Sequence, residues 1–237
     1  MVKTLLLFDV DGTLLKTGGA GMRAMEQVGR ALFGRDFSFE GIQVSGHLDP
    51  LIFAEAAANN GVGNTPFCHQ SFRDGYLKQL ELELTACPEK VHPTPGVERT
   101  LGLLRDRVAE HQDVVLGLLT GNYTLAVPIK LAAAGLDPGW FKVTAFGDEA
   151  PSRSALVPVA IKKYKAICQE PIDANRIIVI GDTPRDVACA HDHGCVAFGV
   201  ATGSFGVDQL RGVGADVVVK DLSDPTPLIR LVDAAAP

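Results

Sequence analysis

Short runs of apolar residues, each closed by a polar or glycine-bearing turn, recur along the chain and constrain its fold more than any other feature. The first run covers residues 4–8 and ends at Asp9, and another covers residues 114–119 and ends at Thr120. Short apolar runs bounded by turn formers are typical of strands buried on both faces of a sheet. Further runs lie at residues 176–180, 196–198 and 216–219.

Segments with helical spacing separate these runs. Apolar residues recur three or four positions apart in residues 97–108, 125–134, 154–169 and 186–193. Alternation of strand and helix predicts an α/β fold, a doubly wound parallel sheet with helices on both faces. Ligands of such sheets bind beyond the carboxyl ends of the strands, and Asp9, Thr120 and Asp182 all fall at strand ends.

The stretch between the first two runs breaks this alternation. Residues 22–33, 49–59 and 67–84 have helical character, and no convincing buried strand lies among them. Residues 88–96 then contain three prolines and a glycine, which is typical of a stiff connection. We therefore expect an α/β core built from residues 1–15 and 90–237, with a helical insertion over residues 16–89.

The composition argues against several classes of protein. The chain has 237 residues, of which 46% are hydrophobic and 21% charged, and this is typical of a folded globular protein. Its net charge of -6 and lack of a Lys/Arg block argue against nucleic-acid binding. The first apolar run is too short for a signal peptide or a membrane span, so we expect a cytoplasmic protein without a membrane partner. Five cysteines without a C-x-x-C pair favour reduced thiols over a disulfide framework.

Paired carboxylates mark two of the strand ends. Asp9 and Asp11 lie in the motif D-x-D-G-T, and Asp182 and Asp186 lie in the motif G-D-x-x-x-D. Carboxylates held this close are costly unless a cation or a proton lies between them. Each motif alone is also compatible with an ordinary turn or with the first turn of a helix. A third strand ends in T-G-N, where a hydroxyl and backbone N–H groups could hold phosphoryl oxygens.

Taken together and in this order, D-x-D-G-T, T-G-N, a cation and G-D-x-x-x-D resemble the motifs of the haloacid dehalogenase superfamily. The resemblance is to its phosphatases with a helical cap inserted after the first strand, such as phosphoglycolate phosphatase and beta-phosphoglucomutase. It spans nearly the entire chain and identifies residues 16–89 with the α-helical cap domain.

The resemblance implies a role for each motif residue. Asp9 would be the nucleophile, and Asp11 would protonate the leaving oxygen and then activate water. Thr120 would bind the transferring phosphoryl group. Mg²⁺ would be the cofactor, because the implied ligands are oxygens. The metal site would comprise Asp9, Asp11 through its carbonyl, Asp182 and Asp186, and backbone groups at Gly12, Gly121 and Asn122 would assist substrate binding.

The chain departs from the family pattern at the cation. Family members usually carry a lysine before the helix that leads to the last motif, often in K-P-x-P. The corresponding segment here contains Arg153, whose guanidinium can bridge a carboxylate and a phosphate. Lys162 and Lys163 are the alternatives, although their positions within a helix favour an exposed face.

Two further groups of residues have both a functional and an ordinary interpretation. Arg23, Ser45, His47 and Asp49 resemble cap residues that face the active site, yet serine and aspartate are also common at helix starts. Cys189, His191, His193 and Cys195 suggest a transition-metal site, but their alternate spacing spreads them around a helix.

The expected function is hydrolysis of a small phosphomonoester, a phosphorylated metabolite, through an aspartyl-phosphate and with Mg²⁺. A phosphomutase would share the same core residues. A hydrolytic dehalogenase would share the nucleophile but has no need of a magnesium site, and a catalytically silent binding protein could share the fold. Neither the substrate nor the oligomeric state follows from the sequence.

Overall fold

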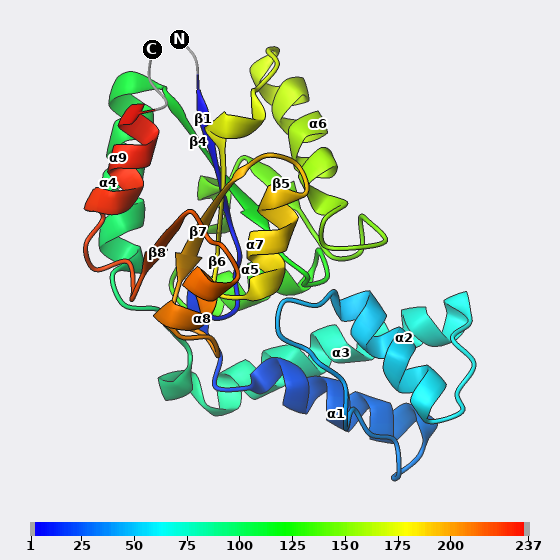
Figure 1. Cartoon of the computed structure of the whole chain (residues 1–237). Coiled ribbons are helices and arrows are strands. Elements are labelled where there is room, and N and C mark those ends of the chain that lie inside the picture. The colour runs from blue at the N-terminus through cyan, green and yellow to red at the C-terminus, as the bar shows by residue number, and fades with distance from the viewer. Residues whose placement is uncertain (1–2, 235–237) are drawn as a thin grey trace.

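The computed structural model describes residues 3–234 and is built around a six-stranded sheet (Figure 1). All neighbouring strands are parallel, and their order is β5-β4-β1-β6-β7-β8. The strands are β1 (Thr4–Phe8), β4 (Val114–Leu119), β5 (Val143–Ala145), β6 (Ile177–Gly181), β7 (Val196–Val200) and β8 (Val217–Val219). The doubly wound parallel sheet predicted from the sequence is therefore confirmed.

Helices cover both faces of this sheet. They are α4 (Val97–His111), α5 (Ala126–Ala133), α6 (Leu156–Cys168), α7 (Pro184–His191), α8 (Val207–Gly212) and α9 (Thr226–Ala234). Alternate residues of β1 explain the two layers. Leu6 and Phe8 belong to a core cluster shared with α4 and α9, whereas Leu5 and Leu7 belong to a second cluster shared with α6 and α7. Because successive strand side chains point to opposite faces, an unbroken apolar strand packs against both helical layers.

Three α-helices occupy the segment between two short strands, β2 (Leu15–Lys16) and β3 (His92–Pro93), which pair antiparallel. We call α1 (Ala20–Phe33), α2 (Asp49–Asn59) and α3 (Pro66–Ala86) the insertion helices. They lie at the end of the sheet toward which β1 runs (Figure 1). Aromatic side chains form much of their core, and the rings of Phe53 and Phe72 stack with centroids 4.2 Å apart. Whether the insertion helices form a separate domain stays a prediction.

The element boundaries differ little from those expected. Residues 49–59 and 114–119 are helix and strand as predicted, and most other boundaries move by one to three residues. Three single-turn 3₁₀ helices, Pro88–Lys90, Pro138–Trp140 and Ala174–Arg176, complete the secondary structure of the described residues. In residues 3–234 no helix combines the length and the apolar character needed to cross a bilayer.

Candidate functional site

Three strand ends converge at the centre of the sheet, where the strand order reverses around β1. Phe8 lies in register with Leu118 of β4 and with Ile180 of β6. The residues that follow these strands therefore meet at one edge. Asp9, Thr120 and Asp182 are brought together there, and all three are buried. A position beyond the carboxyl ends at such a reversal point is where open α/β sheets bind ligands.

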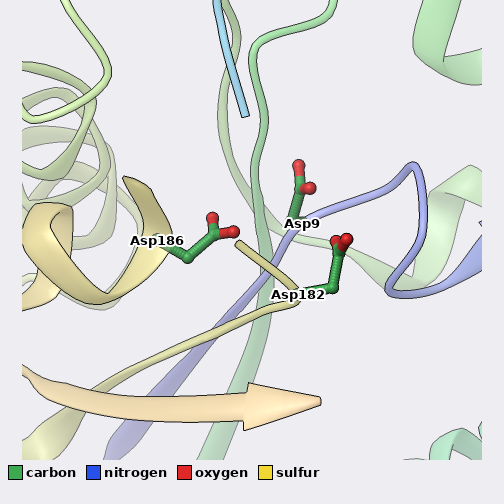
Figure 2. A group of neighbouring side chains, drawn as sticks. All are labelled: Asp9, Asp182 and Asp186. Atoms are coloured by element: carbon green, nitrogen blue, oxygen red, sulfur yellow. The ribbon is translucent and has the colours of Figure 1, made fainter. Parts of the chain in front are cut away.

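Three carboxylates lie within reach of one another at this edge (Figure 2). One oxygen from each of Asp9, Asp182 and Asp186 lies within 4.8 Å of the others, and all three residues are buried. Burial is the main cause that raises the pKa of Asp9 to about 6, although the nearby Arg153 guanidinium opposes it. Burial, reinforced by the charge of Asp9, raises the pKa of Asp182 to about 8. Burial and mutual repulsion therefore favour protonation of these carboxyls unless a further cation lies among them.

Arg153 is the cation that touches this cluster. Its side chain is 7% exposed, and one guanidinium nitrogen lies 3.2 Å from Asp9 Oδ1. The same nitrogen donates to Asp186 Oδ1, and the second terminal nitrogen donates to the Gly46 carbonyl at 3.2 Å. The two alternatives lie elsewhere. Lys162 is exposed, and Lys163 donates to the Thr144 carbonyl and to Glu149.

Asp186 is held in place by its neighbours on both sides. Its Oδ2 accepts hydrogen bonds from the Thr183 backbone N–H at 3.0 Å and from the Thr183 hydroxyl at 2.7 Å. This reciprocal arrangement is a capping box at the start of α7. Since Arg153 occupies the other oxygen, the contacts favour an orienting role for Asp186 over direct metal ligation.

Lys130 is a second buried cation, which is absent from the residues predicted from the motifs. It is 4% exposed, and its Nζ donates to Asp11 Oδ2 at 2.6 Å and to Asn122 Oδ1. Burial lowers the pKa of Lys130, but the carboxylates of Asp11 and Asp49 outweigh it and raise the pKa above its usual value. The available signal was that Lys130 is the only charged residue in the apolar helix α5.

Asn122 links this cation to the strand ends. Its Nδ2 donates to Asp11 Oδ2 and to the Thr120 hydroxyl, both at 2.8 Å. Thr120 is fully buried, whereas the Asp11 side chain remains 41% exposed. Asp11 is therefore fixed by Lys130 and Asn122 at the border between the protein interior and the cavity.

Residues 44–49 of the insertion, which lead into the first residue of α2, lie directly against the T-G-N turn. The Asp49 backbone N–H donates to the Gly121 carbonyl at 2.7 Å, and Asp49 Oδ2 accepts from the Tyr123 N–H at 3.0 Å. The approach is so close that a Cβ on Gly121 would lie 1.8 Å from the His47 carbonyl oxygen. Burial raises the pKa of the Asp49 carboxyl to about 7, against the opposing effect of Lys130.

The remaining insertion candidates differ in position. Ser45, His47 and Asp49 line a cavity of about 640 Å³ above the carboxylates, and Gly12 and Gly121 line it from the core. Arg23 does not line this cavity. Its guanidinium donates to Glu83 and to the Gly18 carbonyl instead.

The cysteine and histidine residues near α7 have separate environments. His191 contacts Asp216, and His193 contacts the carbonyl of Ser154. In the described part of the chain, the acidic cluster is the sole group of three side chains placed to share a metal ion. All five cysteines are unpaired there.

Solved structures of known proteins share this fold. No curated protein matches the chain significantly. Among solved structures, a hydrolase from Pseudomonas syringae superposes with a TM-score of 0.69 at 20% identity, covering 99% of this chain and 100% of that one. A phosphoglycolate phosphatase from Haemophilus somnus 129pt, described as predicted, gives 0.65 at 19% identity, covering 96% and 98%.

A beta-phosphoglucomutase from Clostridium difficile gives a TM-score of 0.70 at 12% identity, covering 99% of this chain and 98% of that one. At such low identities these similarities establish the fold. A model of the haloacid dehalogenase-like hydrolases matches residues 6–191, which is most of the chain and includes every motif described above. The chain belongs to the haloacid dehalogenase-like hydrolase family.

Proposed function

We propose that this protein is a magnesium-dependent phosphohydrolase that cleaves a small phosphomonoester through a phosphorylated Asp9. The observation that carries the proposal is the position of Asp9. It lies at the sheet's reversal point, between the guanidinium of Arg153 and the carboxylates of Asp182 and Asp186. A nucleophilic carboxylate that attacks an anionic phosphoryl group needs positive charge beside it, and this arrangement supplies one cation and room for another.

Thr120 and Arg153 would bind the phosphoryl group on either side of Asp9. The Thr120 hydroxyl is buried and already accepts from Asn122, so its own proton is available to a phosphoryl oxygen. Arg153 would stabilise the negative charge that develops as the phosphorus–oxygen bond breaks. Its buried, two-sided attachment keeps the guanidinium in place during that step.

Asp11 would act as the general acid and base. In the first half of the reaction it would give a proton to the leaving alcohol, and in the second half it would take one from the water that attacks phosphorylated Asp9. The contacts from Lys130 and Asn122 hold its carboxyl at the edge of the cavity, where the leaving oxygen must lie.

The acidic cluster fits a bound Mg²⁺. One guanidinium contacts two of the three buried carboxylates, and all the available donors are oxygens, the ligands that magnesium prefers. Asp9 and Asp182 would hold the ion together with the Asp11 carbonyl, and Asp186 would orient them or a bound water. When bound, the ion would supply charge neutralisation at the phosphoryl oxygens.

The proposal is tested first by turnover. We expect the wild type to release phosphate from a panel of phosphomonoesters in the presence of Mg²⁺. Asp9→Asn should abolish this release while the far-ultraviolet circular dichroism spectrum stays unchanged. Rapid quenching followed by mass spectrometry should show one phosphoryl group on the wild-type peptide that contains Asp9.

Two results would contradict the proposal. Phosphate release by Asp9→Asn at the wild-type rate would eliminate the covalent step. Phosphoryl transfer between two positions of a sugar, without net release, would instead identify a phosphomutase that shares these core residues.

A further inference from the structure

The side of the cavity nearest the insertion helices contains a polar group that no protein contact satisfies. The Tyr76 hydroxyl lies on α3, is fully buried and lines the cavity. Within residues 3–234 it has no hydrogen-bond partner. A buried polar group without a partner is destabilising, so its presence in a binding cavity points to a ligand that completes it.

Two other polar groups with unused capacity accompany this hydroxyl. The Lys130 ammonium has three donors, of which Asp11 and Asn122 accept two. Asp49 accepts from Tyr123 through Oδ2, while its Oδ1 has no hydrogen-bond partner in the described part of the chain. All three side chains line the same cavity.

A glycine on α1 leaves space between two of these groups. A Cβ built on Gly21 would lie 3.6 Å from Lys130 Nζ and also 3.6 Å from the Tyr76 hydroxyl. Both polar atoms therefore face one small volume beside the helix. A methyl group would occupy this volume at ordinary van der Waals distance, without displacing either side chain.

This volume lies on the leaving-group side of the reaction. Lys130 touches the same Asp11 carboxyl that the proposed function assigns to protonation of the leaving oxygen. The cavity of about 640 Å³ is far larger than a phosphoryl group needs and is within the usual range for binding a complete small ligand. Met22, Met25 and Ile52 line the same cavity from the insertion helices.

The charges of the subsite argue against a second anionic group on the ligand. The charge of Lys130 is matched by Asp11, and Asp49 adds a further carboxyl. The other lysines that line the cavity, Lys16 and Lys90, lie in β2 and in the 3₁₀ helix Pro88–Lys90, outside the three side chains of this subsite. The unused capacity of Tyr76, Lys130 and Asp49 therefore consists of one hydroxyl, one ammonium donor and one carboxyl oxygen, a set that matches neutral hydroxyl groups.

We propose that Tyr76, Lys130 and Asp49 form a leaving-group subsite that binds a neutral polyhydroxyl alcohol. The preferred substrates are then monophosphates of sugars or polyols, and phosphorylated carboxylic acids are disfavoured. This inference rests on the proposed phosphohydrolase function and assigns the substrate class of the same site.

Substitutions at Tyr76 and Gly21 test the subsite. Tyr76→Phe removes the hydroxyl and keeps the ring. Gly21→Ala fills the shared volume, and alanine favours the helix over glycine, so the protein should stay folded. The control is Gly102→Ala on α4, where an added Cβ meets nothing within 4 Å. The substrates are glucose 6-phosphate, ribose 5-phosphate, phosphoglycolate and acetyl phosphate, the last of which has no hydroxyl in its leaving group.

We expect the wild type to hydrolyse the sugar phosphates with higher kcat/KM than phosphoglycolate. Each of Tyr76→Phe and Gly21→Ala should lower the ratio of kcat/KM for glucose 6-phosphate to that for acetyl phosphate about tenfold, the effect of one lost hydrogen bond. Gly102→Ala should leave the ratio unchanged. Equal losses on all substrates, or a wild-type preference for phosphoglycolate, would overturn the subsite. The second result would point instead to Lys16 and Lys90 at the cavity wall as partners of a second anion.

Failure of the proposed function would be recognised separately: the wild type would then release phosphate from none of the four compounds faster than the enzyme-free solution does. The subsite is then tested by calorimetric binding of glucose 6-phosphate. Binding about tenfold weaker in Tyr76→Phe and Gly21→Ala than in Gly102→Ala supports it, whereas equal binding in all three variants overturns it.

Discussion

Asp9 sits among partners that act on its charge in opposite directions. The Arg153 guanidinium lowers its pKa, whereas burial and the charges of Asp186 and Asp11 raise it. Arg153 is buried too, and its Nε has no hydrogen-bond partner within the described residues. Arg153 and the acidic cluster therefore have unused capacity for an anion and a cation, and a bound phosphoryl group and a metal ion would fill it.

Substitution of Arg153 should separate a charge role from a geometric one. Arg153→Ala should lower kcat/KM about 10²–10³-fold, the effect of losing one preorganised electrostatic donor. Arg153→Lys should recover part of this loss, because it restores the charge without the two-sided geometry. Steady-state kinetics with Lys162→Ala as the matched control measures both effects. Near wild-type kcat/KM in Arg153→Ala would show that the cation acts elsewhere.

The insertion meets the core through both backbone and side-chain groups. Asp49 begins α2, and its main-chain N–H and side chain both bind the T-G-N turn. Tyr123, which follows that turn, reaches back to α3, where its hydroxyl lies 3.0 Å from His69 Nε2. A helix start that also serves as a docking point explains why an acidic residue is buried there.

The buried Asp49 carboxyl should make stability depend on pH. Its pKa is about 7 in the folded protein and near 3.9 when unfolded, so the folded state binds the extra proton. The stabilising contribution is complete below about pH 4 and disappears as pH rises through 7. Without metal, the melting temperature should therefore fall more between pH 5 and pH 8 in the wild type than in Asp49→Asn. Equal falls in the two proteins would show that Asp49 keeps an ordinary pKa.

Sequence patterns predicted the helices and strands well, but they predicted the contacts between these elements less well. The central strands are unbroken apolar runs and were identified, whereas β5 has three residues with a threonine in the middle and was not. Arg153 was chosen from its place along the chain, and the structure puts it beside Asp9. Lys130 was missed because a lysine within a helix usually faces solvent, and only tertiary packing shows that this one is buried. Tyr76 gave no signal, since an aromatic residue in a helix usually belongs to the core.

For the whole molecule, the sheet and the insertion have different tasks. The sheet brings together groups that are far apart in the sequence, such as Thr13, whose hydroxyl donates to Asp182 Oδ1 at 2.9 Å across 169 positions. The insertion closes one side of the cavity with Ser45, His47 and the helices around them. The site therefore exists only in the folded chain, and ligands that complete it should stabilise the fold.

Magnesium should raise the melting temperature of the metal-free protein. At a concentration about 100 times its Kd, a ligand specific for the folded state adds about 2.7 kcal/mol to the free energy of unfolding. For a protein of this size we expect a rise of about 5 °C or more, measured by calorimetry after EDTA treatment. Sodium chloride at matched ionic strength and the variant Asp182→Asn are the controls. An equal rise in Asp182→Asn would place the ion outside the acidic cluster.

The hydrogen bond from Arg153 to the insertion ends on the main-chain carbonyl of Gly46. Position 46 itself is constrained, because its φ is +67° and a Cβ would lie 2.5 Å from the Thr183 hydroxyl. The neighbouring side chains at Ser45 and His47 take no part in this bond. Mutational drift or directed evolution can therefore change Ser45 and His47 without detaching the loop from Arg153, so the residues at the cavity wall can vary while this contact to the core is kept.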